Sequence, residues 1–550
     1  MDSGDESLAP LVDAATAPLP LGDSADCKVV HHAAAAVGAP PADLPACKTA
    51  GRSRRRRHVK KPRSARRAIV HLTAEYHGYA RTGGLAEAVA GLAASQVRAG
   101  ERVYVFVPLY ASARAAAGRL EPMGPPERIS IGSRAEDVTY CCDASRTSGP
   151  QVIFVDAPGC FDRPGLYGDD AGDYADNHVR FALFARAALH GIARFVDGPV
   201  LLHAHDWHAA LAAVYMRTHP DFAERFAASP TVISVHNAGF QGHFGAAVMP
   251  ELALPPELWH MDRLEWYGRL NLLKGALVFS DAAVTVSPAH AVELRTPEGG
   301  FGLHDTFRQL GARLVGICNG IELPHWDPCT DTQIVRTYSI DDLAGKAACK
   351  EALQRQFGLP IRADIPVIGM SSRLASQKGF DIVVRSERLR DGDMQLVIIG
   401  EGEPRLRHAV SAFVAELPGH VACNLTFTDA LEHQLMAGAD IVLMPSLYEP
   451  CGLTQMHAQR YGALVVGRRV GGIADTVEDG VTGFLFDAFD VRGMDAAIER
   501  ALAVYADAPA WRAMMRRAMT RDFGWDHAVT DYAEVYRAAA RTRRASTKAP

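Results

Sequence analysis

The feature that most constrains this chain is a repeated alternation of short apolar runs with segments of helical periodicity. Each run has the length and composition of a buried strand, and a turn rich in glycine or polar residues usually separates it from the next helix. The runs lie at 68–76, 102–108, 151–158 and 200–203 in the first half and at 367–373, 396–400 and 441–445 in the second. Strands that alternate with helices form parallel sheets. The chain is therefore predicted to be α/β, with two Rossmann-like domains.

Composition agrees with a globular protein of more than one domain. The chain has 550 residues, of which 48% are hydrophobic and 22% charged. Its ten cysteines are scattered, form no CxxC pairs and include the adjacent Cys141 and Cys142, so we expect a reducing compartment rather than a disulfide framework. No apolar run approaches the roughly 20 residues that span a bilayer, and the acidic start is unlike a signal or transit peptide. We expect a cytoplasmic protein without membrane association.

The beginning of the chain carries a strong positive charge. Residues 52–67 contain ten Lys or Arg and no acid, and without them the net charge would fall from -5 to -15. Such a run can contact nucleic acid, a membrane surface or an anionic polymer. Residues 1–67 are also rich in Ala, Pro and Gly and lack an amphipathic pattern, which is typical of a disordered extension. We assign the extension no function and expect no nucleic-acid partner.

A break in the periodicity marks the boundary between the two domains. Around 316–328 the pattern gives way to Gly, Asn and Pro, and the α/β alternation then restarts. We therefore expect a disordered extension at 1–67, an N-terminal domain at 68–315 and a C-terminal domain at 316–529. Residues 530–550 are expected to form a closing helix that packs back on the N-terminal domain, followed by a tail.

The segment PSLYEPCGLTQM at 445–456 places Glu449 in a turn between a strand and a helix. In parallel α/β sheets ligands bind at such turns, because the first N–H groups of the helix have no partner within it. A single turn of this kind is also compatible with a solvated glutamate in an ordinary loop. Its meaning depends on the other turns of the chain.

Two glycine pairs precede helices in a similar way, one in each half. Gly83 and Gly84 follow the first strand, with Glu75 and Arg81 beside them, and a turn with a cation and an acid can hold phosphate and sugar hydroxyls together. A plain tight connection is the alternative for this turn. The second pair lies at 471–472. Two turns suited to phosphate indicate a nucleotide diphosphate donor.

Two cations follow the first strand of the second domain. Arg373 and Lys378 are spaced so that one turn can aim both at a diphosphate, although a pair of surface cations is an equal alternative.

Histidines collect at strand ends of the first domain. The run HAHDWH contains His203, His205, Asp206 and His208, but a two-zinc hydrolase pattern would need them in another order. A metal site is therefore a minor alternative to a loop that faces sugar or to structural histidines. His236 ends the next strand and, with the asparagine after it, suits recognition of hydroxyl groups, although a lone histidine is as often a satisfied core residue.

Seven motifs carry a resemblance to bacterial glycogen synthases and plant starch synthases. In chain order they read ARTGGLAE, HAHDWHAAL, SVHNAGFQGHF, GICNGIELPHWDP, SRLASQKGFD, PSLYEPCGLTQM and RRVGGIADTVEDG. The closing segment DFGWDHAVTDYAEVY is similar to the last helix of that family. The resemblance covers about residues 68–536.

The resemblance implies the GT-B fold, in which two Rossmann-like domains with parallel sheets face each other across a deep interdomain cleft. It also implies a retaining glucosyltransferase that moves glucose from ADP-glucose to the 4-hydroxyl at the non-reducing end of an α-1,4-glucan. The C-terminal domain would hold the nucleotide and the N-terminal domain the acceptor. The implied partners are ADP-glucose and the glucan, no metal or cofactor is expected, and the oligomeric state is left open.

The resemblance also implies roles for individual residues. Arg373 and Lys378 would neutralise the diphosphate as the bond to ADP breaks, which is electrostatic stabilisation of the leaving group without a metal. Glu449 would bind the donor glucose and support positive charge at the anomeric carbon, His236 would line the glucose site, and Asp206 would lie near the acceptor. The remaining implied contacts are Glu75, Arg81, Gly83, Gly84, Asn237, Cys451, Gly452, Leu453 and Thr454 on the donor, and Trp207 and Glu87 on the acceptor side.

Retention of configuration requires either a covalent intermediate or attack on the face that the leaving group departs from. Only Glu449 and Asp206 are good candidates for the carboxylate of a covalent route. The resemblance favours attack on the same face, with the departing phosphate taking the proton of the acceptor.

Two positions depart from the family pattern, because Arg81 replaces a usual lysine and Glu87 replaces a common aspartate. His457 stands where many other retaining GT-B enzymes carry a second glutamate, but the family that this chain resembles commonly lacks that glutamate as well. Arginine keeps the charge but changes its reach, so the preference for ADP over UDP is left open. Two other classes also remain open: a metal-dependent hydrolase that uses HAHDWH, and a catalytically idle glycan-binding protein. Glu449 together with the two cations argues against the idle protein.

Overall fold

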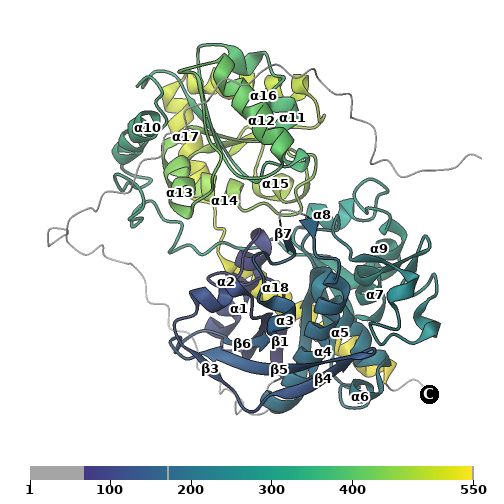
Figure 1. Ribbon diagram of the computed structural model, residues 1–550. Coiled ribbons are helices and arrows are strands. Elements are labelled where there is room, and N and C mark those ends of the chain that lie inside the picture. The colour runs from purple at the N-terminus through teal and green to yellow at the C-terminus, as the bar shows by residue number, and fades with distance from the viewer. Residues whose placement is uncertain (1–66, 170–171, 548–550) are drawn as a thin grey trace, which may run out of the picture. The chain divides into compact units, whose positions relative to one another are not determined.

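The computed structural model describes residues 67–169 and 172–547. The extension and basic run predicted at 1–67 therefore lie outside the described residues, except for Arg67. The described residues belong to one compact unit that contains two large sheets (Figure 1). The prediction of an α/β protein with two parallel-sheet domains is confirmed.

The sheet of the N-terminal domain is parallel through most of its width. Its parallel strands, in spatial order, are β15 (Leu314–Gly316), β14 (Ala282–Thr285), β10 (Thr231–Val235), β9 (Val200–His205), β1 (Ala68–Leu72), β2 (Val103–Pro108) and β6 (Gln151–Asp156). The chain builds outward from β1 through β2 to β6, and then returns to β9 on the other side of β1. The strand order therefore reverses between β1 and β9.

An antiparallel extension widens this sheet next to β6. It consists of β5 (Arg134–Asp143), β3 (Leu120–Pro122) and β4 (Glu127–Ile131). Buried and exposed positions mix along these strands, which is usual where one face of an antiparallel sheet meets solvent. Their polar residues explain why the segment between β2 and β6 carries no clear strand pattern in the sequence.

The sheet of the C-terminal domain is parallel throughout. Its spatial order is β18 (Val421–Asn424), β17 (Gln395–Ile399), β16 (Val367–Ser371), β19 (Ile441–Met444), β20 (Leu464–Arg468) and β21 (Gly483–Phe486). This is the dinucleotide-binding order 3-2-1-4-5-6, and it reverses between β16 and β19.

Helices connect the strands, and the N-terminal domain also contains short additional strands (Figure 1). The N-terminal domain contains α1 (Gly84–Arg98), α2 (Ala111–Ala116), α3 (Pro158–Phe161), α4 (Asn177–Phe195), α5 (Asp206–Thr218), α6 (Pro220–Ala223), α7 (Leu272–Phe279), α8 (Pro288–Glu293) and α9 (His304–Leu310), and the short strands β7 (Gly168–Asp169), β8 (Gly172–Asp173), β11 (His243–Gly245), β12 (Glu265–Trp266) and β13 (Arg269–Asn271).

The C-terminal domain and the end of the chain supply the remaining helices. These are α10 (Ala344–Gln356), α11 (Phe380–Val383), α12 (Pro404–Glu416), α13 (Asp429–Gly438), α14 (Thr454–Arg460), α15 (Gly471–Thr476), α16 (Val491–Tyr505), α17 (Ala508–Met519) and α18 (Trp525–Ser546).

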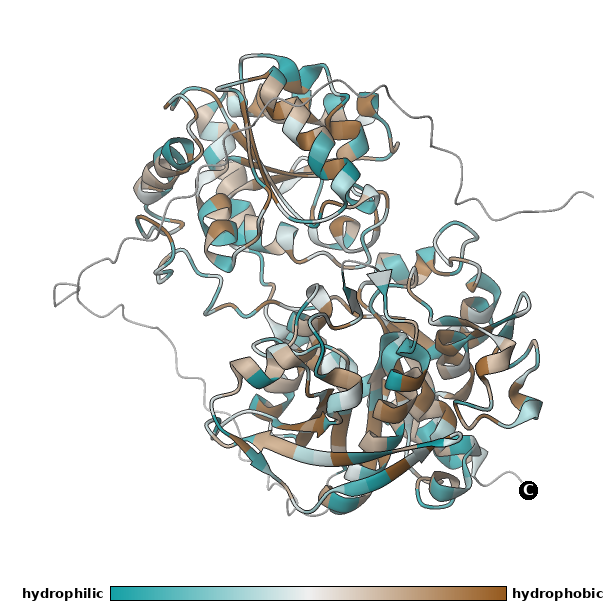
Figure 2. Cartoon of the chain, viewed as in Figure 1, coloured by the Kyte–Doolittle hydropathy of each residue, from teal (hydrophilic) through white to brown (hydrophobic). Residues whose placement is uncertain are grey.

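The parallel strands form the core of each domain. Strands β1, β10, β16 and β17 are buried along their whole length, because helices cover both faces of their sheets. Figure 2 shows strands in the brown of hydrophobic residues inside the molecule, while many helices carry teal hydrophilic positions. Within residues 67–169 and 172–547, no helix is long and apolar enough to cross a membrane.

The last helix, α18, returns to the N-terminal domain. Trp525, Tyr532 and Tyr536 of α18 join a buried cluster with residues of α1, β1, β9, β10 and β14. Gly91 of α1 permits this approach, since a Cβ at that position would lie 2.2 Å from the indole nitrogen of Trp525. The end of the chain thus packs against the N-terminal sheet.

Candidate functional site

The predicted site residues follow the strands at which each sheet order reverses. Arg373 and Lys378 come after β16, and Glu449 comes after β19. In the N-terminal domain Glu75 follows β1, and Asp206 follows β9 directly. Ligands of open parallel sheets bind outside the carboxyl ends of the strands at such reversals. The fold therefore places these five side chains where a ligand is expected in each domain.

Glu449 lies in a buried, charge-paired position. The ammonium group of Lys378 donates to Oε2 of Glu449 at 2.5 Å, and the hydroxyl of Ser446 donates to the same oxygen at 3.0 Å. The side chain of Glu449 is only 6% exposed. The loops after β16 and β19 are also joined by Gln377, whose amide donates to the carbonyl of Tyr448 at 3.0 Å.

The glycine pair at 471–472 supports the loop of Glu449 instead of presenting free N–H groups. The N–H of Gly472 donates to the carbonyl of Glu449 at 3.0 Å, and the N–H of Gly471 donates to Oε1 of Glu293 at 2.7 Å. A Cβ on either glycine would lie about 2 Å from a carbonyl oxygen of Glu449 or Cys451. The interpretation of this turn as a phosphate cradle is therefore wrong in this structure. Close packing requires the two glycines, and Glu449 and Glu293 already accept from their N–H groups.

The residues after Glu449 lead directly into α14. Gly452 adopts a left-handed φ of 69°, Leu453 caps the helix and Thr454 is its first residue. The amide of Gln455 donates to the carbonyls of Cys451 and Gly452 and holds this bend. Burial raises the pKa of the Cys451 thiol, so the thiol stays protonated and is a poor nucleophile.

Glu75 organises the glycine turn of the N-terminal domain. Its carboxylate accepts from the backbone N–H of Thr82 at 2.7 Å and of Gly83 at 3.2 Å, and also from the Thr82 hydroxyl. The hydroxyl of Tyr167 donates to it at 2.8 Å. Glu75 therefore holds the turn before α1 through these hydrogen bonds. Gly84 is the first residue of that helix.

Arg81 and Glu87 form an ion pair that extends to the C-terminal domain. The guanidinium of Arg81 lies 2.8 Å from Glu87 and 2.9 Å from Asp429, the first residue of α13. Burial raises the pKa of Glu87, and the charge of Arg81 opposes that rise. The ring of Trp207 lies against the rings of Phe181, His208 and Phe244. The two residues predicted on the acceptor side thus have different surroundings.

Asp206 has a strained backbone and a buried side chain. Its φ of 54° is left-handed, which is uncommon for a residue other than glycine. The carboxylate accepts from the backbone N–H of His236 at 2.7 Å. Burial raises the pKa of Asp206 to about 7, against the backbone N–H groups of His236 and Asn237, which lower it. This aspartate fixes the loop that carries His236.

That loop connects the two groups of predicted residues. The side chain of Asn237 accepts from the N–H of Gly239 at 2.9 Å and is hydrogen-bonded to the hydroxyl of Tyr448. Tyr448 precedes Glu449, and the positive charge of Arg373, which is exposed, acts on its hydroxyl. The structure thus links Asp206, His236 and Asn237 through one tyrosine to the loop of Glu449.

Several residues that build the site are absent from the predictions made from sequence. They are Thr82, Tyr167, Gln377, Ser446 and Tyr448. Ser446 and Tyr448 lie in the predicted segment 445–456 and could have been inferred from their proximity to Glu449. Tyr167 has no local pattern that points to it.

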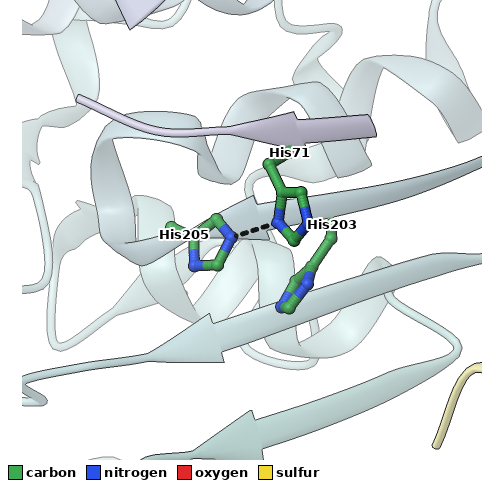
Figure 3. A group of neighbouring side chains, drawn as sticks. All are labelled: His71, His203 and His205. Carbon is green, nitrogen blue, oxygen red and sulfur yellow. Dashed lines mark hydrogen bonds between the residues drawn. The ribbon is translucent and has the colours of Figure 1, made fainter. Parts of the chain in front are cut away.

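The strand β9 continues to His205 and α5 begins at Asp206, so the run HAHDWH does not form a loop, which is one of its two interpretations beside structural histidines. Pairing with β1 and β10 on both sides extends the strand. His203 and His205 lie two residues apart on one face of β9, opposite His71 of β1, and the three rings form a buried group with a metal-like spacing (Figure 3). Both ring nitrogens of each histidine already have hydrogen-bonding partners. A metal would have to displace these partners, so the donor set fits a structural role better.

Comparison with known proteins decides the family. A family model described as the starch synthase catalytic domain matches residues 68–309, and one described as glycosyl transferases group 1 matches residues 365–503. Glycogen synthase from Anaeromyxobacter sp. (strain Fw109-5) is 41% identical over 479 residues, which cover 86% of this chain and 99% of that protein. Glycogen synthase 2 from Geobacter sulfurreducens is 40% identical over 483 residues, with the same two coverages. This chain belongs to the glycogen and starch synthase family.

Solved structures agree with the synthase family and its fold. The catalytic domain of starch synthase IV from Arabidopsis thaliana, bound to ADP and acarbose, matches with a TM-score of 0.79 and 30% identity. The match covers 86% of this synthase and 99% of that chain. Sucrose-phosphate synthase from Thermosynechococcus elongatus, at 19% identity and a TM-score of 0.54, shares the fold. The resemblance to glycogen and starch synthases and the GT-B fold that it implies are confirmed, while the roles of individual residues stay predictions.

Proposed function

We propose that this synthase transfers glucose from ADP-glucose to the 4-hydroxyl at the non-reducing end of an α-1,4-glucan, with retention of configuration. The observation that carries the proposal is the ion pair between Glu449 and Lys378, in the loops after β16 and β19 at the strand-order reversal of the C-terminal sheet. Starch synthase IV, the related structure, is bound to ADP, which supports ADP as the leaving group here.

The two cations have different surroundings. Arg373 is exposed and free to move toward a diphosphate, while Lys378 is half-buried and already held by Glu449. When a donor binds, Arg373 adds a planar fork of N–H donors and Lys378 adds a point charge. Together they offset the negative charge that develops on the diphosphate as the glycosidic bond breaks.

The carboxylates favour attack on the same face over a covalent intermediate. One oxygen of Asp206 is held by the backbone N–H of His236. A carboxylate with a pKa of about 7 is also partly protonated at neutral pH, which weakens it as a nucleophile. Glu449 is tied to Lys378 and Ser446, which suits binding of sugar hydroxyls and support of positive charge at the anomeric carbon. In our proposal the departing phosphate takes the proton of the acceptor hydroxyl.

The reaction is tested by following labelled glucose into glycogen from ADP-glucose and, in parallel, from UDP-glucose. Each reaction is run with and without EDTA. We expect transfer from ADP-glucose that EDTA leaves unchanged, and slower transfer from UDP-glucose. Glu449→Ala should lower transfer at least about a hundredfold, as expected for a group that acts in the transition state.

Two results would contradict the proposal. Well-folded protein that transfers glucose from neither donor would indicate a glycan-binding protein without activity. Stoichiometric zinc in the purified protein, together with activity lost in EDTA, would favour a metal-dependent hydrolase. Arg81→Lys in the same assay would show whether the substitution at that position silences an otherwise complete site.

We also propose that the enzyme acts in the cytoplasm. The scattered cysteines and the adjacent Cys141 and Cys142 favour a reducing compartment. Fractionation of the source cells with an antibody against the chain would test this location.

A further inference from the structure

A chain of hydrogen-bonded side chains runs through the core of the N-terminal domain and ends at His236. Gln96 of α1 contacts His71 with an Oε1 to Nε2 distance of 2.8 Å. Nδ1 of His71 lies 2.9 Å from Nε2 of His205, and Nδ1 of His205 lies 2.9 Å from Nε2 of His236. The first of these hydrogen bonds is the dashed line in Figure 3. Gln96, His71 and His205 are each at most 1% exposed. The chain thus links a helix on one side of the sheet to the predicted glucose site.

Gln96 sets the direction of each hydrogen bond in the series from Gln96 to His236. Its Nε2 donates to the hydroxyl of Tyr536 at 2.9 Å, so its Oε1 faces His71 as an acceptor. Nε2 of His71 must therefore carry the hydrogen. A neutral imidazole has one donor and one acceptor nitrogen, so Nδ1 of His71 accepts. The same reasoning gives His205 a donating Nε2 and an accepting Nδ1, and it gives His236 a donating Nε2.

The three histidine rings are neutral, because burial disfavours their charged form. Desolvation lowers the pKa of His71 to about 4 and that of His236 to about 3, and it lowers the pKa of His205 well below its ordinary value. Each ring therefore has a single hydrogen to place at neutral pH.

We propose that Gln96, His71 and His205 are positioning residues that hold His236 as its Nε2–H tautomer, so that Nδ1 of His236 is a hydrogen-bond acceptor at the glucose site. The assignment of a glucose site to His236 rests on the proposed function. The tautomer itself rests only on the hydrogen bonds. In the other tautomer Nδ1 would carry a hydrogen and could not accept from a sugar hydroxyl.

His203 belongs to a separate branch and offers a matched control. The hydroxyl of Tyr536 already accepts from Gln96, so it donates to Nδ1 of His203 at 2.9 Å. Nε2 of His203 then donates to the hydroxyl of Ser234 at 2.7 Å. Removal of the Ser234 hydroxyl disturbs the same buried region without breaking the chain from Gln96 to His236.

The tautomer is measured directly by ¹⁵N NMR of the full chain with ¹⁵N-labelled histidine. His236 is assigned by comparison with His236→Gln, and coupling to ring protons distinguishes a protonated from a bare nitrogen. We expect the wild type to show a protonated Nε2 and a bare Nδ1 on His236. A protonated Nδ1 would overturn the proposal. This measurement requires neither enzymatic activity nor a substitution at Gln96, His71 or His205.

Three variants test whether Gln96 imposes the tautomer. Gln96→Met keeps the size but removes the acceptor, and we expect His236 to become a mixture of tautomers. Gln96→Glu keeps the tautomer, because a buried neutral carboxyl can accept from His71 and donate to Tyr536 as the amide does. Ser234→Ala is also expected to keep it. A tautomer unchanged in Gln96→Met would overturn the role of the chain.

Kinetics connect the tautomer to the proposed reaction. With ADP-glucose we expect kcat to fall about three- to tenfold in Gln96→Met, the effect of one neutral hydrogen bond, and to stay within about twofold in Gln96→Glu and Ser234→Ala. An equal loss in Ser234→Ala would indicate general damage to the core and contradict a positioning role. If the wild type transfers no glucose, the proposed function fails, while the spectrum still decides the tautomer.

Discussion

Lys378 and Glu449 are 71 residues apart in the chain, and Nζ of the lysine lies 2.5 Å from Oε2 of the glutamate. They follow β16 and β19, the neighbouring strands at which the order of the C-terminal sheet reverses. Their side chains are 19% and 6% exposed, so the pair is largely removed from water. The lysine is therefore the charge partner of the glutamate in the absence of substrate.

Removal of the lysine charge should affect both stability and activity. In Lys378→Met the carboxylate of Glu449 stays buried without its cation, and breaking such a pair costs up to about 3 kcal/mol. Transfer from ADP-glucose should fall at least about a hundredfold, because a charge that stabilises the leaving group is lost. Denaturant unfolding and the labelled-glucose assay measure the two effects.

The double variant Lys378→Met with Glu449→Gln separates these effects. Without a buried charge it should regain most of the stability that Lys378→Met loses, while its activity stays low. A double variant as unstable as Lys378→Met would show that the pair contributes little to the fold.

Gly91 should be required for the docking of the last helix. Gly91→Ala places a methyl group 2.2 Å from Nε1 of Trp525, so α1 or α18 must move. Overpacking of a core costs about 1 to 3 kcal/mol, and the melting temperature should fall accordingly. Gly159→Ala is the control, since its added Cβ meets nothing within 4 Å. If both variants melt alike, the contact between Gly91 and Trp525 is unimportant.

Arg81→Lys should change donor binding more than stability. Arg81 contacts Glu87 and Asp429 with separate guanidinium nitrogens, and lysine cannot reproduce that fork. The side chains are partly exposed, so the stability change should stay below about 1 kcal/mol. We expect KM for ADP-glucose to rise a few-fold with kcat nearly unchanged. Asp429→Asn removes one partner only, and a larger effect on KM from Asp429→Asn would contradict a direct role of Arg81.

The buried histidines should make the protein sensitive to acid. The folded pKa values of His71 and His236, about 4 and 3, lie below the unfolded value near 6.5, and those of His203 and His205 are also depressed. Their contribution to stability is therefore present above pH 6.5 and is lost as the pH falls toward 4, by about 1.4 kcal/mol per pH unit for His71 and for His236.

Asp206 changes the dependence of stability on pH in the opposite direction to the histidines. Its folded pKa of about 7 lies above the unfolded value, so its contribution is present at low pH and is lost as the pH rises through 7. Four histidines outweigh one aspartate below pH 6.5. Calorimetry at pH 7.5, 6.5 and 5.5 should show a falling melting temperature. His203→Gln should reduce this slope, and His527→Gln, at a residue 81% exposed, should not. A melting temperature independent of pH would contradict the prediction.

Much of the fold and part of the site could be predicted from local patterns. Apolar runs of strand length followed by helical segments indicate two parallel sheets. A strand that is buried on both faces consists of consecutive apolar residues, and such a run is visible in the sequence. The predicted strand at 441–445 is observed at Ile441–Met444. Glu449, Asp206 and the glycines of the turn before α1 are recognisable by their positions after such runs.

Other features depend on which strands become neighbours, and no local pattern contains that information. The order of the sheets brings β16 beside β19 and β1 beside β9. Only this order pairs Lys378 with Glu449 and turns His71 toward His205. The sequence pattern suggests free N–H donors at residues 471–472. In the structure that turn packs against the loop of Glu449, and the N–H of Gly472 donates to the carbonyl of Glu449. Residue types along the chain therefore determine which strands, helices and chemical groups are present, whereas tertiary packing determines their partners, because hydrogen bonds and ion pairs require contact between segments far apart in the chain.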